Sequence, residues 1–137
     1  MDYLLDTNAC IALNKGTPAS VRVRFAAAVN GGAQVWVPSI VLHELWYGVV
    51  KSARPKENAD DLATFLAGAV HVLAFGADDA REAGEVRALL ERIGKPIGAY
   101  DVLIAGQALR RGLTLVTANV REFGRVKGLV WEDWGKA

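Results

Sequence analysis

The chain has 137 residues, 52% hydrophobic and 23% charged, so it can form one compact domain with a sizeable core. Sixteen basic and fifteen acidic side chains leave a formal charge of +1, which excludes nucleic-acid binding through a positive charge spread over the whole protein. A single cysteine, Cys10, excludes an internal disulfide, and we expect a cytoplasmic protein because neither a signal peptide nor an apolar run of about 20 residues is evident.

The first half of the chain alternates short apolar runs with helical patterns. We predict strands at residues 3–5 and 35–37 and a helix from about residue 9, which Thr7 and Asn8 can cap. Further helices are predicted at 18–29, from the N-cap Ser39 to residue 50, and at 59–66. The charged stretch 52–58, which contains Pro55, predicts an exposed connection.

The second half continues the alternation. A strand is predicted at 71–75, followed by a helix at 78–93 whose apolar residues recur at helical spacing until Gly94 and Pro96. A helix at 99–111 has Asp101 in its first turn, and strands follow at 113–116 and 129–131. Strands alternating with helices indicate an α/β sandwich with a mainly parallel sheet, formed by a single domain over 1–137.

Three acidic residues occupy similar positions in separate strand-helix units. Asp6 follows the first strand, whereas Glu44 and Asp101 lie near the starts of helices, and sites in such folds form beyond the carboxyl ends of the strands. Two carboxylates about 4 Å apart repel by roughly 4 kcal/mol at an effective dielectric near 20. If the three converge, they must therefore be protonated, paired with bases or bridged by a cation. Oxygen ligands favour Mg²⁺, or Mn²⁺, over zinc.

Each acid alone also fits a structural role. Asp6 could cap a helix, Asp101 could complement a helix dipole, and Glu44 could pair with Lys51 or Arg54 on the surface. The case for a site therefore depends on the three acids being brought together.

Four segments in order resemble one known family. They are LLDTN at 4–8, SIVLHEL at 39–45, YDVLIA at 100–105 and LVTANVREF at 115–123, and the terminal VWEDW at 130–134 extends the match over nearly the whole chain. Together they resemble PIN-domain ribonucleases, most closely the VapC-type toxins of type II toxin-antitoxin pairs. The resemblance implies an α/β/α sandwich with a central, mainly parallel sheet of four to five strands.

The resemblance also implies a metal-dependent endoribonuclease. Asp6, Glu44 and Asp101 would be catalytic acids that hold Mg²⁺, which activates water to leave a 5′-phosphate and a 3′-hydroxyl. Many relatives have Asp where this chain has Asn119, and Glu122 follows three positions later, so either residue could complete the site. The polar residues that would support the acids are Asn8, Ser39, Thr117 and Asn119.

Several partners follow from the same resemblance. RNA would contact local basic residues, namely Arg110, Arg111, Arg121 and Arg125, with Lys51, Arg54 and Lys56 as further candidates. An antitoxin that binds DNA and is encoded nearby would occupy a hydrophobic groove near Leu13, Trp46, Tyr47 and Val50. A homodimer and a larger toxin-antitoxin complex would form. We expect His43 to have no catalytic role, because consecutive helix residues point about 100° apart.

Other functions fit parts of the pattern. A solitary PIN nuclease of RNA processing would share the chemistry, and a non-catalytic nucleic-acid-binding domain would share the fold. A phosphatase that uses Asp6 as its nucleophile is disfavoured, because phosphatases of the haloacid-dehalogenase type need Asp where this chain has Asn8.

Overall fold

The computed structural model describes residues 1–136 and confirms the α/β class; Ala137, the last residue of the predicted domain, lies outside the described residues. All strand pairs of its five-stranded sheet are parallel, and the order is β3-β2-β1-β4-β5. The strands are β1 (Tyr3–Leu5), β2 (Val35–Pro38), β3 (His71–Leu73), β4 (Thr114–Val116) and β5 (Trp131–Glu132). β1 is therefore central, although it comes first in the chain.

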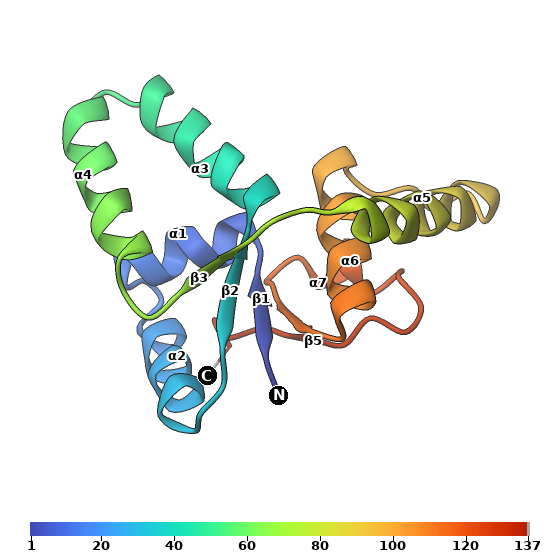
Figure 1. The fold of residues 1–137 in the computed structure, drawn as a ribbon, viewed down its shortest axis with the longest axis horizontal. Helices are drawn as coiled ribbons and strands as arrows, with labels where there is room; N and C mark the ends of the chain where they lie inside the picture. The colour runs from blue at the N-terminus through green and yellow to red at the C-terminus, as the bar shows by residue number, and fades with distance from the viewer. Residues whose placement is uncertain (137) are drawn as a thin grey trace.

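Helices connect the parallel strands and cover the sheet. They are α1 (Thr7–Lys15), α2 (Ala19–Asn30), α3 (Ser39–Lys51), α4 (Pro55–Leu66), α5 (Ala77–Arg92), α6 (Ala99–Arg111) and α7 (Val120–Phe123). Figure 1 shows α1 to α4 gathered on one side of the molecule, with α5 and α6 on the other. No helix within residues 1–136 combines the length and apolar character required to cross a membrane.

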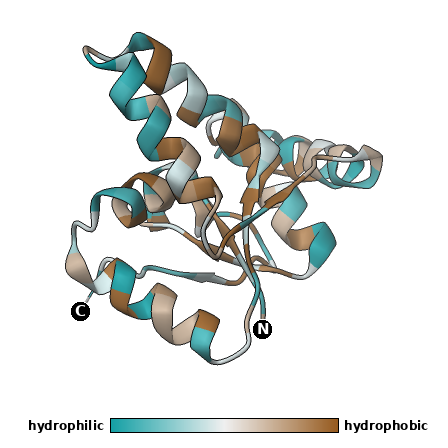
Figure 2. Ribbon diagram, turned by 60° about the vertical axis from the view of Figure 1, so that its left-hand side comes forward, coloured by the Kyte–Doolittle hydropathy of each residue, from teal (hydrophilic) through white to brown (hydrophobic). Residues whose placement is uncertain are grey.

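The core lies around the central strands. Leu4 and Leu5 of β1 are at most 1% exposed, and so are Leu115 and Val116 of β4. Continuous apolar runs of this kind are typical of parallel strands that are covered on both faces. In Figure 2 the strands at the centre are mostly hydrophobic, while hydrophilic colour is spread along the outer helices.

Where α5 and α6 cross on one side of the sheet, α6 contributes no side chain. A Cβ added to Gly106 of α6 would lie 2.5 Å from the Cα of Ala83 in α5. The missing side chain lets the two backbones approach closely and helps to fix the position of α6, which carries Asp101.

Several predicted boundaries are wrong for local reasons. α4 begins at Pro55 inside the expected connection 52–58, since proline suits the first position of a helix, where its missing N–H costs nothing. Ser39 is the first helical residue and not the N-cap, and the strand at the C-terminal end is Trp131–Glu132 instead of 129–131. The four-residue helix α7 was not predicted, because it is too short to show a periodic pattern.

Candidate active site

Three of the predicted site residues meet beyond the carboxyl ends of the strands. Asp6 follows β1, Thr117 follows the neighbouring β4, and α3 continues directly from β2 and carries Glu44. Because β1 lies between β2 and β4 in the parallel sheet, these strand ends share one edge. Asp101 reaches the same region from the first turn of α6.

Asp6 is fixed at this edge by its surroundings. It is the N-cap of α1, and its Oδ1 accepts a hydrogen bond from the Ala9 N–H at 2.7 Å, so it does cap a helix as the structural alternative supposed. Burial raises the pKa of Asp6, although hydrogen bonds from Thr117 and the Ala9 N–H oppose the increase, and the charge of Glu44 adds to it. Asp6 is thus both a structural cap and a member of a group of interacting carboxylates.

Glu44 is held by a residue that the sequence analysis considered only as a cap. The Thr7 hydroxyl donates to Glu44 Oε1 at 2.9 Å, which joins the first turn of α1 to α3. Within residues 1–136, neither Lys51 nor Arg54 forms an ion pair with Glu44, so the surface ion pair considered above is wrong. In the sequence, the only sign of this contact is that a threonine, Thr7, directly follows Asp6.

Asp101 and Glu122 form the second half of the cluster. Burial, a hydrogen bond with Glu122, and the charges of Glu122, Asp6 and Glu44 raise the pKa of Asp101 to about 7. A hydrogen bond from Asn119 is the main cause that lowers the pKa of Glu122, followed by its bond with Asp101. Below about pH 7, a proton bound by this pair is therefore held on Asp101, while Glu122 carries the charge.

Asn119 supports Glu122. Its Nδ2 donates to Glu122 Oε2 at 2.9 Å, and its backbone N–H donates to the buried Thr117 hydroxyl oxygen at 2.9 Å. Glu122 thus reaches the acidic cluster, and Asn119 orients it. Thr117 links the two halves of the site, because its hydroxyl also hydrogen-bonds Asp6.

Ser39 and Asn8, the other two residues predicted to support the acids, form no hydrogen bond with them in the described part of the chain. Ser39 Oγ accepts from the Phe75 N–H at 3.1 Å, so Ser39 anchors the chain after β3 to the start of α3. Asn8 is exposed on the first turn of α1. Ser39 therefore positions Glu44 only through its helix.

The chemistry of the cluster fits a hard cation. All four acids offer oxygen, and their mutual repulsion raises the pKa of Asp101. Gly98 has no side chain to crowd Asp101, whereas a Cβ at that position would lie only 3.3 Å from Asp101 Oδ2. The space beside this carboxylate therefore stays open. Within residues 1–136 no three Asp, Glu, His or Cys side chains are close enough to enclose a metal ion. Mg²⁺ does not require such a cage, because it usually keeps several water ligands.

Four arginines predicted to bind RNA fall into two groups. Arg110 pairs with Asp78 at 3.2 Å and Arg111 pairs with the buried Asp79 at 3.0 Å, at the opposite end of α6 from Asp101. This geometry does not support the prediction that Arg110 and Arg111 contact a phosphate bound at the acidic cluster. Arg121 and Arg125 lie closer to the acids, as their contribution to the lowered pKa of Glu122 indicates. Arg125 also donates a hydrogen bond to the Pro96 carbonyl at 2.9 Å.

A groove lies between α1, α3 and α4. Its volume is about 550 Å³, and Glu44 lines one part of it. Its apolar lining consists of Cys10, Ile11, Leu45, Val49, Leu62 and Phe65. The four residues expected here do not line this groove: Leu13 is a core residue that is 6% exposed, and Trp46, Tyr47 and Val50 are exposed on α3 outside it.

Comparison with known proteins agrees with this geometry. Residues 3–129 match the model of the PIN domain, and the chain belongs to the PIN-domain family. It is 45% identical over 98% of both chains to a tRNA(fMet)-specific endonuclease VapC from Shigella flexneri, and 40% identical, with the same coverage, to one from Salmonella typhimurium.

Solved structures give the same result. The fold superimposes with a TM-score of 0.91 on a chain of the VapBC2 crystal structure from Rickettsia felis bound to a promoter DNA fragment. That match has 36% identity and covers 98% of this chain and 99% of the other. A chain of DNA-bound VapBC from Salmonella typhimurium gives a TM-score of 0.89 at 40% identity, with 98% of both chains covered.

Proposed function

We propose that this protein is a Mg²⁺-dependent endoribonuclease and the toxin of a toxin-antitoxin pair. The observation that carries the proposal is the convergence of Asp6, Glu44 and Glu122 on Asp101, whose side chain feels the charge of all three. The full-length relatives named as VapC ribonucleases support an RNA substrate.

The side chains of this site have separate tasks in such a reaction. Bound Mg²⁺, for which Mn²⁺ could substitute, would lower the pKa of a water molecule and neutralise charge on the phosphate. Asp6, Glu44 and Asp101 would hold the ion, and Glu122 would extend the set. Thr7, Thr117 and Asn119 fix the directions of these carboxylates through hydrogen bonds.

Initiator tRNA is the first substrate to test. Two relatives that are 45% and 40% identical are named tRNA(fMet)-specific endonucleases, and both matches span 98% of each chain. We propose the same substrate class for this protein.

An antitoxin segment is the proposed occupant of the groove between α1, α3 and α4. Similar chains were solved in VapBC assemblies with DNA, and a groove of mixed apolar and polar lining that includes Glu44 suits a polypeptide that blocks the acids. We also propose a cytoplasmic location and a homodimer, which would join a larger complex with the antitoxin. The groove favours this function over a solitary RNA-processing nuclease.

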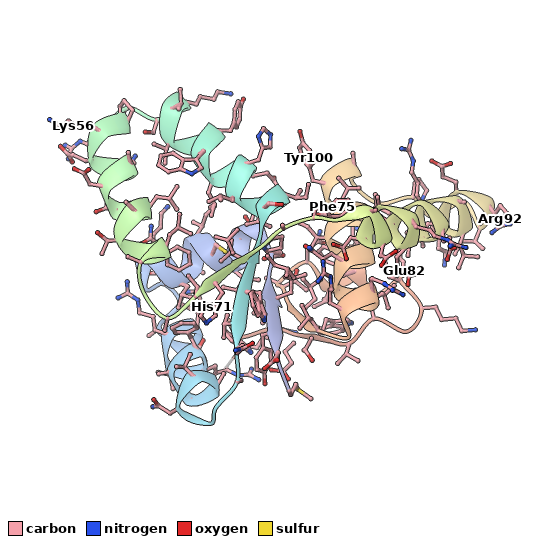
Figure 3. The ribbon with its side chains drawn as sticks, in the orientation of Figure 1. Lys56, His71, Phe75, Glu82, Arg92 and Tyr100 are labelled. Atoms are coloured by element: carbon pink, nitrogen blue, oxygen red, sulfur yellow. The ribbon has the colours of Figure 1, made fainter. Side chains whose placement is uncertain are left out.

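The decisive experiment compares cleavage of initiator and elongator methionine tRNAs by the purified protein. We expect a single cut in the initiator tRNA with Mg²⁺ and none with EDTA. Glu44→Gln and Asp101→Asn should lower the rate by about a hundredfold or more. Glu82→Gln, at a half-buried position of α5 outside the acidic cluster (Figure 3), should behave as wild type.

Cleavage that persists in EDTA, or in both acid variants, would contradict the proposed mechanism. In cells, the wild-type protein should arrest growth, and the small DNA-binding protein encoded beside it should relieve the arrest. Normal growth at high expression would contradict the toxin assignment.

A further inference from the structure

Two aromatic rings meet across the gap between α3 and α6. The His43 and Tyr100 rings are 5.8 Å apart between centroids, with an interplanar angle of 62°, an edge-to-face arrangement. His43 directly precedes Glu44, and Tyr100 directly precedes Asp101. The pair therefore joins the two helices that supply acids to the site from separate parts of the chain.

Both rings are accessible at the rim of the site. His43 is exposed, and Tyr100 remains 48% exposed despite the contact. Figure 3 shows Tyr100 projecting from the start of α6, away from the body of the helix. Because an edge-to-face contact covers one face of one ring only, aromatic surface remains available to a ligand.

The charge of the site makes such a surface useful. The carboxylates that raise the pKa of Asp101 also repel RNA phosphates, and Arg110 and Arg111 are occupied by Asp78 and Asp79. Base stacking on an aromatic ring adds affinity without charge. A phosphodiester held at the acids also brings its two flanking nucleosides to the rim, where these rings lie.

Building on the proposed function, we propose that His43 and Tyr100 stack on a base next to the scissile phosphate. They thereby position the RNA strand and help to select the bond that is cut. The role belongs to substrate binding, because neither ring is among the groups that hold the metal.

A matched control exists elsewhere in the protein. His71 contacts the Trp36 ring at 5.2 Å between centroids, so it forms a second contact between an imidazole and an aromatic side chain. It lies at the start of β3, well away from Tyr100 in Figure 3. His71→Ala removes a comparable contact at the amino end of β3, the opposite edge of the parallel sheet from the acids.

The experiment measures steady-state cleavage of an RNA that the wild-type protein cuts. His43→Ala and Tyr100→Ala should each raise KM about tenfold with a small change in kcat, whereas Tyr100→Phe and His71→Ala should match wild type. An RNA that lacks the base of the nucleotide beside the cut should raise the KM of the wild-type protein as much as Tyr100→Ala does. With that RNA, Tyr100→Ala should cause no further increase in KM. Circular dichroism and melting temperature establish that each variant is folded.

Three outcomes would overturn the inference. One is wild-type KM in both alanine variants, and another is a fall in kcat alone, which would give the pair only a structural role. The third is unchanged cleavage with an altered oligomeric state, which would assign the rings to a protein interface. If the wild-type protein cuts no RNA, the proposed function fails, and this inference fails with it.

Discussion

The raised pKa of Asp101 and the lowered pKa of Glu122 indicate how the site exists without a cation. Burial and neighbouring carboxylates make ionisation of Asp101 unfavourable, and Asn119 and nearby arginines keep the charge on Glu122. The folded protein therefore retains electrostatic repulsion at this site whenever Asp101 is ionised, and a cation would relieve it.

Asp101→Asn should stabilise the metal-free protein. At pH 8, above the Asp101 pKa of about 7, the amide removes a repelled charge and can donate to Glu122. After allowance for partial exposure, we expect a gain of about 1 kcal/mol, or about 3 °C in melting temperature, in EDTA. Thermal unfolding measures it, with Glu82→Gln as the control.

Added Mg²⁺ should then raise the melting temperature of the wild-type protein more than that of Asp101→Asn. An Asp101→Asn protein that melts below wild type in EDTA would show that repulsion does not dominate at this position.

Asp79 makes the opposite contribution. It is fully buried, and its two oxygens accept two hydrogen bonds from Arg111, one from the Gly76 N–H and one from Gln107. Burial alone would raise the pKa of Asp79, but these bonds and the charge of Arg111 outweigh it and lower the pKa. Ionised Asp79 thus stabilises the fold and joins the start of α5 to the end of α6.

The pH dependence follows from that direction. Because the folded pKa lies below the unfolded value of about 3.9, the stabilisation is complete above about pH 4 and is lost as the pH falls through the folded pKa. Asp79→Asn should lower the free energy of unfolding by about 2 kcal/mol at pH 7, and the stability of the variant should fall less steeply as the pH decreases. Urea unfolding at pH 7 and pH 3 tests this, and an equally steep acid loss in the variant would contradict it.

At the scale of elements, the crossing of α5 and α6 depends on one missing side chain. Gly106→Ala would push a methyl group against the Ala83 backbone, so the helices must separate, at a cost of about 2 kcal/mol. Gly84→Ala, in α5, meets nothing within 4 Å and should add up to about 1 kcal/mol through helix propensity. Urea unfolding of both variants should give changes of opposite sign.

Most elements could be predicted from sequence, because apolar periodicity reports which side of an element is buried. The predictions failed where a single local interaction decides the structure. Ser39 bonds Phe75 across a sequence separation of 36 residues instead of capping its own helix, and α7 is four residues long. Neither feature leaves a periodic trace.

The sequence predicted the acids of the candidate site but not the hydrogen bonds that hold them. Asp6, Glu44 and Asp101 were found from their positions after strands and at helix starts and from the ordered motifs. The hydrogen bond from Thr7 to Glu44 and the one from Asn119 to Glu122 depend on tertiary packing. In the structure Asn119 donates a hydrogen bond to Glu122, a relation that the spacing alone left open.

For the whole molecule, Trp134 closes the core at the end of the described chain. It is 2% exposed, and its ring lies 5.1 Å from Tyr3 of β1 and 6.5 Å from Phe25 of α2 between centroids. Trp134→Ala should cost about 3–4 kcal/mol, with Trp134→Phe recovering much of it. The measurement is urea unfolding followed by circular dichroism. Trp131→Ala, at a position 39% exposed, should cost less than half as much.

The central position of β1 also has a consequence for the order of events during synthesis. Leu5 of β1 pairs with Val116 of β4, so the middle of the sheet cannot close until almost the whole chain has left the ribosome. Such a high contact order slows folding, and the acids themselves extend from residue 6 to residue 122. A nascent chain that has not yet released β4 and α7 therefore carries no assembled acidic cluster.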